Sequence, residues 1–88
     1  MTNKVVLYGT RICPYCVAAR SLLAGRNIVF EDISVDGNRE LREHMEQISG
    51  RDTVPQIWIG ETHVGGYTEL RQLAGSGELD TLLSLTAG

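Results

Sequence analysis

The 88-residue sequence has no excess of basic charge and no long apolar run. Its net charge at pH 7 is −3, with eight Lys and Arg against eleven Asp and Glu. Nucleic acids and anionic membranes bind basic surfaces, so we expect neither as a partner. No segment approaches the roughly 20 apolar residues that cross a bilayer. The residues after Met1 lack the apolar core of a signal peptide, which predicts a cytoplasmic protein.

The chain is also short and poor in cysteine. Its 88 residues predict one domain, 1–88, without room for a second functional unit. The two cysteines are Cys13 and Cys16, separated by two residues. A disulfide across so small a loop restricts the unfolded chain little, and cytosolic thiols are mostly kept reduced. The pair therefore indicates redox chemistry or metal binding.

The hydrophobic pattern predicts an α/β fold. Strand-like runs and helical spacings alternate at first, and the chain then turns to a hairpin and further helices. The predicted strands are 4–8, 28–33, 56–59 and 63–64; the predicted helices are 14–25, a segment around 41–48 that ends near Gly50, a segment around 67–74 and a last short one around 79–83, with a break at 75–77. This order is βαβ followed by ββα, which predicts a four-stranded mixed sheet with helices on both faces.

Cys13-Pro14-Tyr15-Cys16 is the motif that carries chemistry. Pro14 favours the first position of a helix, so Cys13 is expected at a helix N-terminus directly after a strand. The helix dipole and the free N–H groups there favour the thiolate, and such sites bring a cysteine pKa from about 8.5 to roughly 3.5–7.5. Cys16, one turn on, faces the same way and should be more buried. We therefore expect Cys13 to attack a disulfide, and Cys16 or a second thiol to resolve the intermediate.

Zinc binding is the competing interpretation of the cysteine pair. A structural zinc site needs four ligands, and the chain offers only His44 and His63 besides the two cysteines. These histidines lie in different predicted elements without ligand-like spacing, and both are expected at the surface. We therefore expect no metal site.

Two further motifs are weak when taken alone. In Thr53-Val54-Pro55, a proline opens a strand. If the Val54–Pro55 bond is cis, the backbone N–H and C=O of Val54 are free to pair with an extended peptide. The competing interpretation is an ordinary trans proline at a strand edge, which is the commoner state. Gly65-Gly66 precedes a helix, where close backbone approach and the helix N-terminus suit a carboxylate, although a plain turn explains it equally.

Together these three motifs resemble the dithiol glutaredoxins, and the short bacterial members in particular. Cys13 to Cys16, Thr53 to Ile57 and Gly65 to Leu70 occur in the order and spacing of that family, and the match covers essentially the whole chain. The resemblance implies a thioredoxin-like fold, a cis Pro55, glutathione as the reductant, and protein disulfides or glutathionylated proteins as substrates. It also implies a monomer.

The resemblance implies a glutathione site as well. Val54 would make main-chain hydrogen bonds to the cysteinyl part, residues 66–69 would surround the γ-glutamyl end, and Arg42 would contact the glycyl carboxylate. The glutathione-binding residues expected from the family are Arg11, Tyr15, Arg42, Thr53, Val54, Pro55, Gly66, Tyr67, Thr68 and Glu69.

Two positions depart from the family pattern. Many members carry a lysine three residues before the first cysteine, where this chain has Thr10, and Arg11 could supply that charge. The acid after the glycine pair is usually aspartate, and here it is Glu69. Trp58 and Met45 are expected in the core.

Two alternatives stay open at this point. Some glutaredoxins carry an iron–sulfur cluster between two subunits, although Pro14 is unlike the smaller or polar residue of cluster-binding members. Thioredoxin reductase could replace glutathione as the electron donor, and the missing lysine at position 10 leaves room for that reading.

Overall fold

The computed structural model describes residues 3–84 and contains four strands and four helices. The strands are β1 (Val5–Gly9), β2 (Glu31–Ser34), β3 (Gln56–Ile59) and β4 (Thr62–Gly65). The helices are α1 (Pro14–Gly25), α2 (Arg39–Ser49), α3 (Tyr67–Ser76) and α4 (Glu78–Ser84). No helix in this part of the chain is long and apolar enough to cross a membrane.

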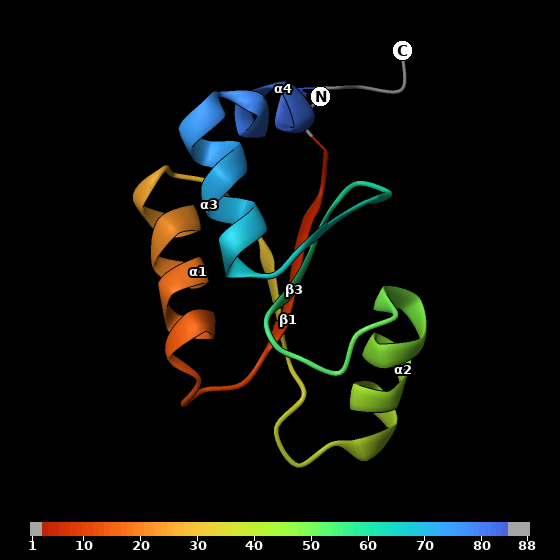
Figure 1. Ribbon diagram of the computed structural model, residues 1–88. Helices are drawn as coiled ribbons and strands as arrows, with labels where there is room; N and C mark the ends of the chain where they lie inside the picture. The colour runs from red at the N-terminus through yellow and green to blue at the C-terminus, as the bar shows by residue number, and fades with distance from the viewer. Residues whose placement is uncertain (1–2, 85–88) are drawn as a thin grey trace.

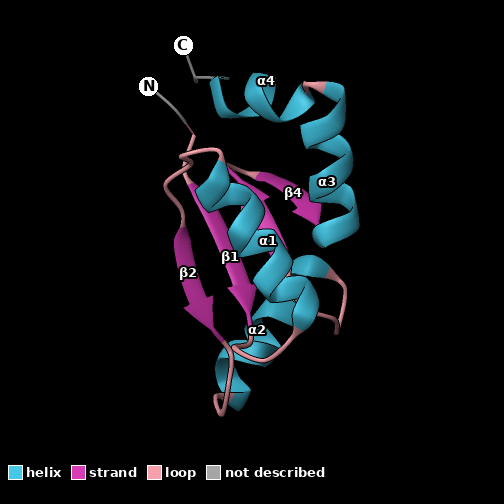
Figure 2. Cartoon of the chain, turned by 90° about the vertical axis from the view of Figure 1, so that its left-hand side faces the viewer, coloured by secondary structure: helices cyan, strands magenta, loops and turns pink. Residues whose placement is uncertain are grey.

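The strands form one mixed sheet in the order β2-β1-β3-β4 (Figures 1 and 2). β1 pairs with β2 in parallel and with β3 in antiparallel orientation, and β3 pairs with β4 in antiparallel orientation. Helices α1 and α3 lie on one face and α2 on the other. The predicted fold class, a thioredoxin-like α/β fold with a four-stranded mixed sheet flanked by helices, is confirmed.

The core lies between the sheet and the layer of α1, α3 and α4. Alternate strand residues point into it, as the period-two pattern of a strand requires. The buried cluster consists of Val5, Leu7, Ala19, Leu23, Ile57, Ile59, Leu70 and Leu79. This packing fixes the start of α1 beside the end of β1, where the two cysteines lie.

Several predicted boundaries differ from the structure. The second strand is Glu31–Ser34 rather than 28–33, because Asn27 takes a left-handed φ of 59° and the Ile28 N–H bonds the Leu23 carbonyl. The chain then runs irregularly, with Val29 92% exposed, before it pairs with β1.

The later helices and strands also shift by a few residues. α3 continues through Gly75 to Ser76 and ends where Gly77 takes a φ of 83°. β4 is longer than 63–64, and Gly50 ends α2 in the left-handed conformation as expected. Met45 is in the core as predicted, whereas Trp58 is only half-buried.

Candidate active site

Cys13 lies at the N-terminal end of α1, directly after the loop that leaves β1. Its backbone is extended (φ −75°, ψ 120°), and its carbonyl accepts the Val17 N–H at 3.0 Å, which begins the helix. Pro14 occupies the first turn, as predicted. The Cys13 side chain is partly exposed and its Sγ lies 3.8 Å from the Val54 carbonyl oxygen.

The surroundings of Cys13 favour its thiolate. Burial opposes ionisation, but hydrogen bonds from the Cys16 N–H, the Cys16 thiol and the Tyr15 N–H, together with the positive charge of Arg20, hold the pKa of Cys13 below its ordinary value. The backbone contribution is that of a helix N-terminus, as the sequence predicted. These contacts at the start of α1 favour ionisation of the Cys13 thiol.

Cys16 has the opposite character. Its side chain is fully buried, and burial raises its pKa, with a smaller contribution from the nearby Cys13, against the opposing hydrogen bond from the Thr10 N–H. The Thr10 N–H donates to its Sγ at 3.4 Å. The predicted difference in burial between the two cysteines is thus present, and the Cys16 thiol is placed so that its hydrogen bond to Cys13 favours ionisation of Cys13.

A groove beside Cys13 brings together most of the residues predicted to bind glutathione. It has a volume of about 220 Å³, and one side carries Tyr15 and Tyr67 with ring centres 6.4 Å apart. The peptide bond between Val54 and Pro55 is cis. The groove is lined by Tyr15, Arg51, Thr53, Val54, Pro55, Gly66, Tyr67, Thr68 and Glu69.

The Glu69 carboxylate lines this groove. Its Oε1 accepts the Gly66 N–H at 2.7 Å and the Arg51 Nη1 at 2.9 Å. These two contacts, that of Gly66 first, lower the pKa of Glu69. Gly65 has a φ of 113°, a conformation that favours glycine, and a Cβ there would displace the Glu69 carboxylate.

Arg11 and Arg42 lie outside the groove. Arg11 is exposed, and its backbone N–H, rather than its side chain, donates to Asp36 at 2.9 Å. Arg42 donates through Nη2 to the Asp52 carbonyl at 2.8 Å and lines a neighbouring hollow together with Thr10. Eight of the ten predicted residues therefore meet in one groove, and these two do not.

Sequence reasoning missed two charged residues of the site. Arg20 supplies a positive charge near Cys13 from the second turn of α1, and its Nε bonds the Asp32 carboxylate at 2.9 Å. Arg51 lines the groove and bonds Glu69. Neither arginine belongs to a recognisable motif. The only sequence signal was that Arg20 closely follows the cysteine motif and Arg51 closely precedes the Thr53-Val54-Pro55 motif.

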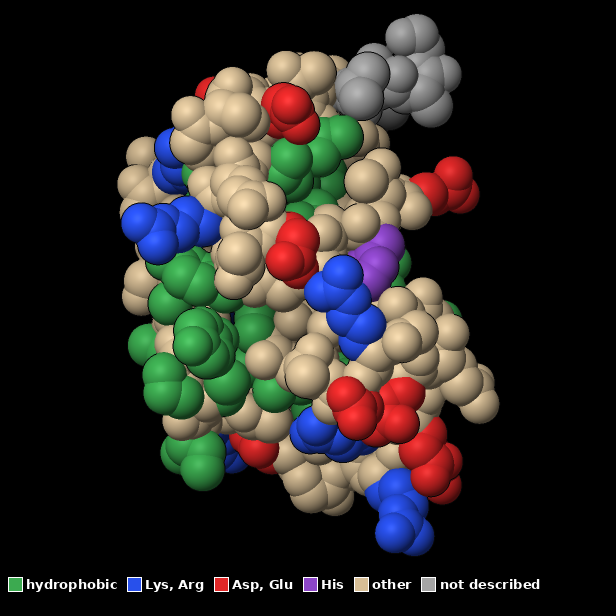
Figure 3. Space-filling view, viewed as in Figure 1, with side chains coloured by type: hydrophobic (Ala, Val, Ile, Leu, Met, Phe, Trp, Pro, Cys, Tyr) green, Lys and Arg blue, Asp and Glu red, His purple; other side chains and the backbone are tan. Residues whose placement is uncertain are grey.

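Hydrophobic side chains gather at the end of the molecule where α1 begins (Figure 3). The exposed members from this stretch are Ile12, Tyr15 and Val17, with Ile12 90% exposed. All three are close neighbours of Cys13 along the chain.

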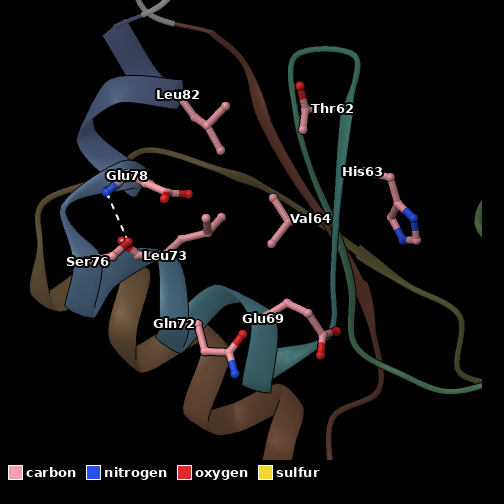
Figure 4. Close-up of a pocket in the computed structure, with 9 residues that line it drawn as sticks. All are labelled: Thr62, His63, Val64, Glu69, Gln72, Leu73, Ser76, Glu78 and Leu82. Carbon is pink, nitrogen blue, oxygen red and sulfur yellow. Dashed lines mark hydrogen bonds between the residues drawn. The ribbon is translucent and has the colours of Figure 1, made fainter.

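A second hollow of about 560 Å³ lies between β4, α3 and α4 (Figure 4), and no cysteine lines it. Within residues 3–84, no cluster of three or more His, Cys, Asp or Glu side chains is arranged to hold a metal ion.

Comparison with known proteins agrees with this geometry. The Glutaredoxin family model matches residues 5–64. A glutaredoxin of Pseudomonas aeruginosa is 51% identical over 80 residues, covering 91% of this chain and 95% of that protein. The solution structure of a dithiolic glutaredoxin from Trypanosoma brucei brucei is similar at a TM-score of 0.83 and 39% identity, covering 93% of this chain and 88% of that one.

A second similar structure contains a ligand. The crystal structure of a buckwheat glutaredoxin–glutathione complex has a TM-score of 0.85 and 25% identity, covering 93% of this chain and 77% of that one. The match to the family model and the identity to the bacterial relative extend over most of the sequence, including both cysteines. The chain therefore belongs to the glutaredoxin family and is a glutathione-dependent thiol–disulfide oxidoreductase.

Proposed function

We propose that Cys13 is the nucleophile and Cys16 the resolving thiol in the reduction of protein disulfides and glutathione mixed disulfides. The observation that carries this assignment is the contrast between the two thiols. Cys13 is partly exposed with a lowered pKa, whereas Cys16 is buried with a raised one and donates a hydrogen bond to Cys13. A thiolate attacks a disulfide and a thiol does not, so the order of reaction follows from this contrast.

With a glutathionylated protein, the Cys13 thiolate attacks the glutathione sulfur. A bond forms between Cys13 and glutathione, the bond to the protein sulfur breaks, and the protein leaves as a thiolate that takes up a proton. A second glutathione thiolate then attacks the glutathione sulfur on Cys13. Oxidised glutathione leaves and the Cys13 thiolate is restored, so Cys16 is not required for this route.

With a protein disulfide, the Cys13 thiolate first forms a mixed disulfide with one protein sulfur and releases the other as a thiol. The Cys16 sulfur, after losing its proton, attacks Cys13 and releases the second protein thiol. Two glutathione molecules then reduce the Cys13–Cys16 disulfide and leave as oxidised glutathione. This route consumes two electrons from glutathione for each protein disulfide, and it requires both cysteines.

Glutathione is proposed to occupy the groove beside Cys13. Val54 offers main-chain groups next to the reactive sulfur, and the N-terminal turn of α3 with Gly66, Tyr67 and Thr68 suits a carboxylate. Glu69 stands at the γ-glutamyl end, and Arg42, in the neighbouring hollow, is assigned to the glycyl carboxylate. The likeness to a glutaredoxin crystallised with glutathione supports this placement.

The protein substrates are proposed to dock on the apolar surface around Ile12, Tyr15 and Val17. An exposed apolar patch beside a reactive sulfur favours an extended peptide segment that presents its disulfide to Cys13. We place this reaction in the cytoplasm, where the glutathione pool is reducing. The proposed working form is a monomer that consists of one domain.

A coupled assay tests the assignment. Turnover of a glutathione mixed disulfide is followed through glutathione, glutathione reductase and NADPH, for the unaltered protein and for Cys13→Ser and Cys16→Ser. We expect Cys13→Ser to abolish turnover and Cys16→Ser to retain it. Cys16→Ser should, however, lose the reduction of a protein disulfide, so this variant distinguishes the two routes. Equal loss in both variants would contradict the assignment. Turnover with thioredoxin reductase but not with glutathione would overturn the proposed donor.

A further inference from the structure

Gln56 is a buried polar residue that no step of the mechanism uses. It is the first residue of β3, follows Pro55 directly, and is 1% exposed. Its Nε2 donates to the Thr53 carbonyl at 3.0 Å and lies 3.2 Å from the Thr53 hydroxyl. Its Oε1 lies 2.8 Å from Nε2 of His63. A buried carboxamide is costly unless both ends have partners, and here both do.

The partners fix which way the carboxamide points. The Thr53 carbonyl can only accept, so the NH2 end of Gln56 must face it and the oxygen must face His63. The imidazole therefore donates through Nε2. Burial, followed by the charge of Arg51, lowers the pKa of His63 against the opposing effect of Glu69, so the neutral Nε2–H form is the relevant one at neutral pH.

His63 is itself held in place by aromatic contacts. Its ring stacks on Trp58 with centres 4.7 Å apart and planes 28° apart, and Trp58 meets the Tyr8 ring edge-on at 5.4 Å. His63 and Trp58 are also direct partners in the pairing of β3 with β4. The expectation that His63 is a plain surface residue is therefore wrong: it is half-buried and bonded.

These contacts lead to the segment that faces the reactive sulfur. Thr53 and Val54 both line the groove, and the Val54 carbonyl lies 3.8 Å from the Cys13 Sγ. Gln56 holds Thr53 from the buried side, at both its carbonyl and its hydroxyl. We propose that Gln56, oriented by His63, is a positioning residue that fixes Thr53 and Val54 for glutathione binding. The inference rests on the glutathione groove proposed above.

Gln56→Glu tests this idea because it keeps the shape and replaces the donating end with an acceptor. The carboxylate would face the Thr53 carbonyl, so the hydrogen bonds from Gln56 to Thr53 are lost. These bonds, together with the His63 bond that orients Gln56, are called the tether below. We expect the apparent KM for glutathione to rise about three- to tenfold, as for one lost buried hydrogen bond, with a smaller change in kcat. His63→Phe retains an aromatic ring against Trp58 but removes the donor to Gln56, and should shift KM in the same direction by less.

Val6→Ala is the matched control. Val6 is the partner of Trp58 in the pairing of β1 with β3, is half-buried on the same sheet face, and takes no part in the hydrogen bonds of Gln56 with Thr53 and His63. It should lower thermal stability and leave KM unchanged. If KM rises in proportion to the loss of thermal stability in all three variants, Val6→Ala included, the positioning role is refuted. An unchanged KM in both Gln56→Glu and His63→Phe would refute it as well.

A second measurement does not depend on turnover. The backbone amide resonances of Thr53 and Val54 in a proton–nitrogen NMR spectrum of the reduced protein should shift in Gln56→Glu and His63→Phe and stay in place in Val6→Ala. Unshifted resonances in both tether variants would overturn the proposal. If the unaltered protein lacks glutathione-dependent turnover, the proposed function fails, and these resonances still decide whether the tether exists.

Discussion

Gly9, the last residue of β1, separates the buried thiol from the sheet. A Cβ added there would lie 3.0 Å from the Cys16 Sγ, 3.1 Å from Leu7 Cδ2 and 3.2 Å from Arg20 Nη2. All three distances are shorter than ordinary van der Waals contact, and both Cys16 and Leu7 are fully buried. Because Gly9 does not have a positive φ, Gly9→Ala tests this crowding without backbone strain.

The expected cost is that of one extra carbon in a packed core, about 1–3 kcal/mol. For a domain of this size, a loss of about 2 kcal/mol lowers Tm by roughly 8–16 °C. The relief of crowding also displaces the Cys16 thiol, which weakens its hydrogen bond to Cys13 and so raises the pKa of Cys13. Gly9→Ala should therefore be both less stable and slower to alkylate at pH 6.

Thermal unfolding of the reduced protein, followed by circular dichroism, measures the first effect. Gly75→Ala is the control, because Gly75 lies within α3 and a Cβ there meets no atom within 4 Å. It should stabilise the protein by about 0.5–1 kcal/mol, the usual gain of alanine over glycine in a helix. A Tm of Gly9→Ala equal to or above that of the unaltered protein would refute the crowding argument.

Two further predictions concern charge. Arg20→Met removes a positive charge that lowers the pKa of Cys13. Alkylation of Cys13 by iodoacetamide at pH 6, measured in a Cys16→Ser background, should therefore slow, whereas Arg26→Met, just after the C-terminal end of α1, should not change it. The lowered pKa of Glu69 means that its contribution to stability is complete above its unfolded pKa and is lost as the pH falls through its folded pKa. Glu69→Gln should therefore cost about 0.5–1 kcal/mol at pH 7 and reduce the pH dependence of urea unfolding below about pH 5; an unchanged pH profile would contradict the assignment.

The order of elements could be predicted because local signals agree with the fold. Pro14 and the apolar spacing after it place the start of α1 to the residue, and Gly50 ends α2 as expected. The second strand could not be placed by hydrophobicity, because its residues are held by pairing rather than burial. Glu31 bonds Lys4 at 2.7 Å and Asp32 bonds Arg20 at 2.9 Å, so charged residues form this edge of the sheet.

Some residues of the candidate site could be predicted from the sequence and others could not. Cys13 and the groove-lining motifs were predictable because each is a contiguous run of residues whose type fits its task. Arg51 and Arg20 were not, because each acts through the reach of a long side chain toward a residue 18 and 12 positions away, respectively. Gln56 and His63 were missed for a related reason: a seven-residue separation across a hairpin gives no periodic signal.

Asn3 ties the beginning of β1 to the end of α4. Its N–H donates to the Leu83 carbonyl at 2.9 Å, and its side-chain Nδ2 donates to the Leu82 carbonyl at 2.9 Å. This junction lies at the opposite end of the molecule from the start of α1, where Cys13 sits (Figure 1). Because Asn3 and the last turn of α4 lie together at this end, a linker joined to the chain next to either of them would start far from the reactive sulfur. The fold is suited to use as a tethered redox sensor without any change to its sequence between these two points.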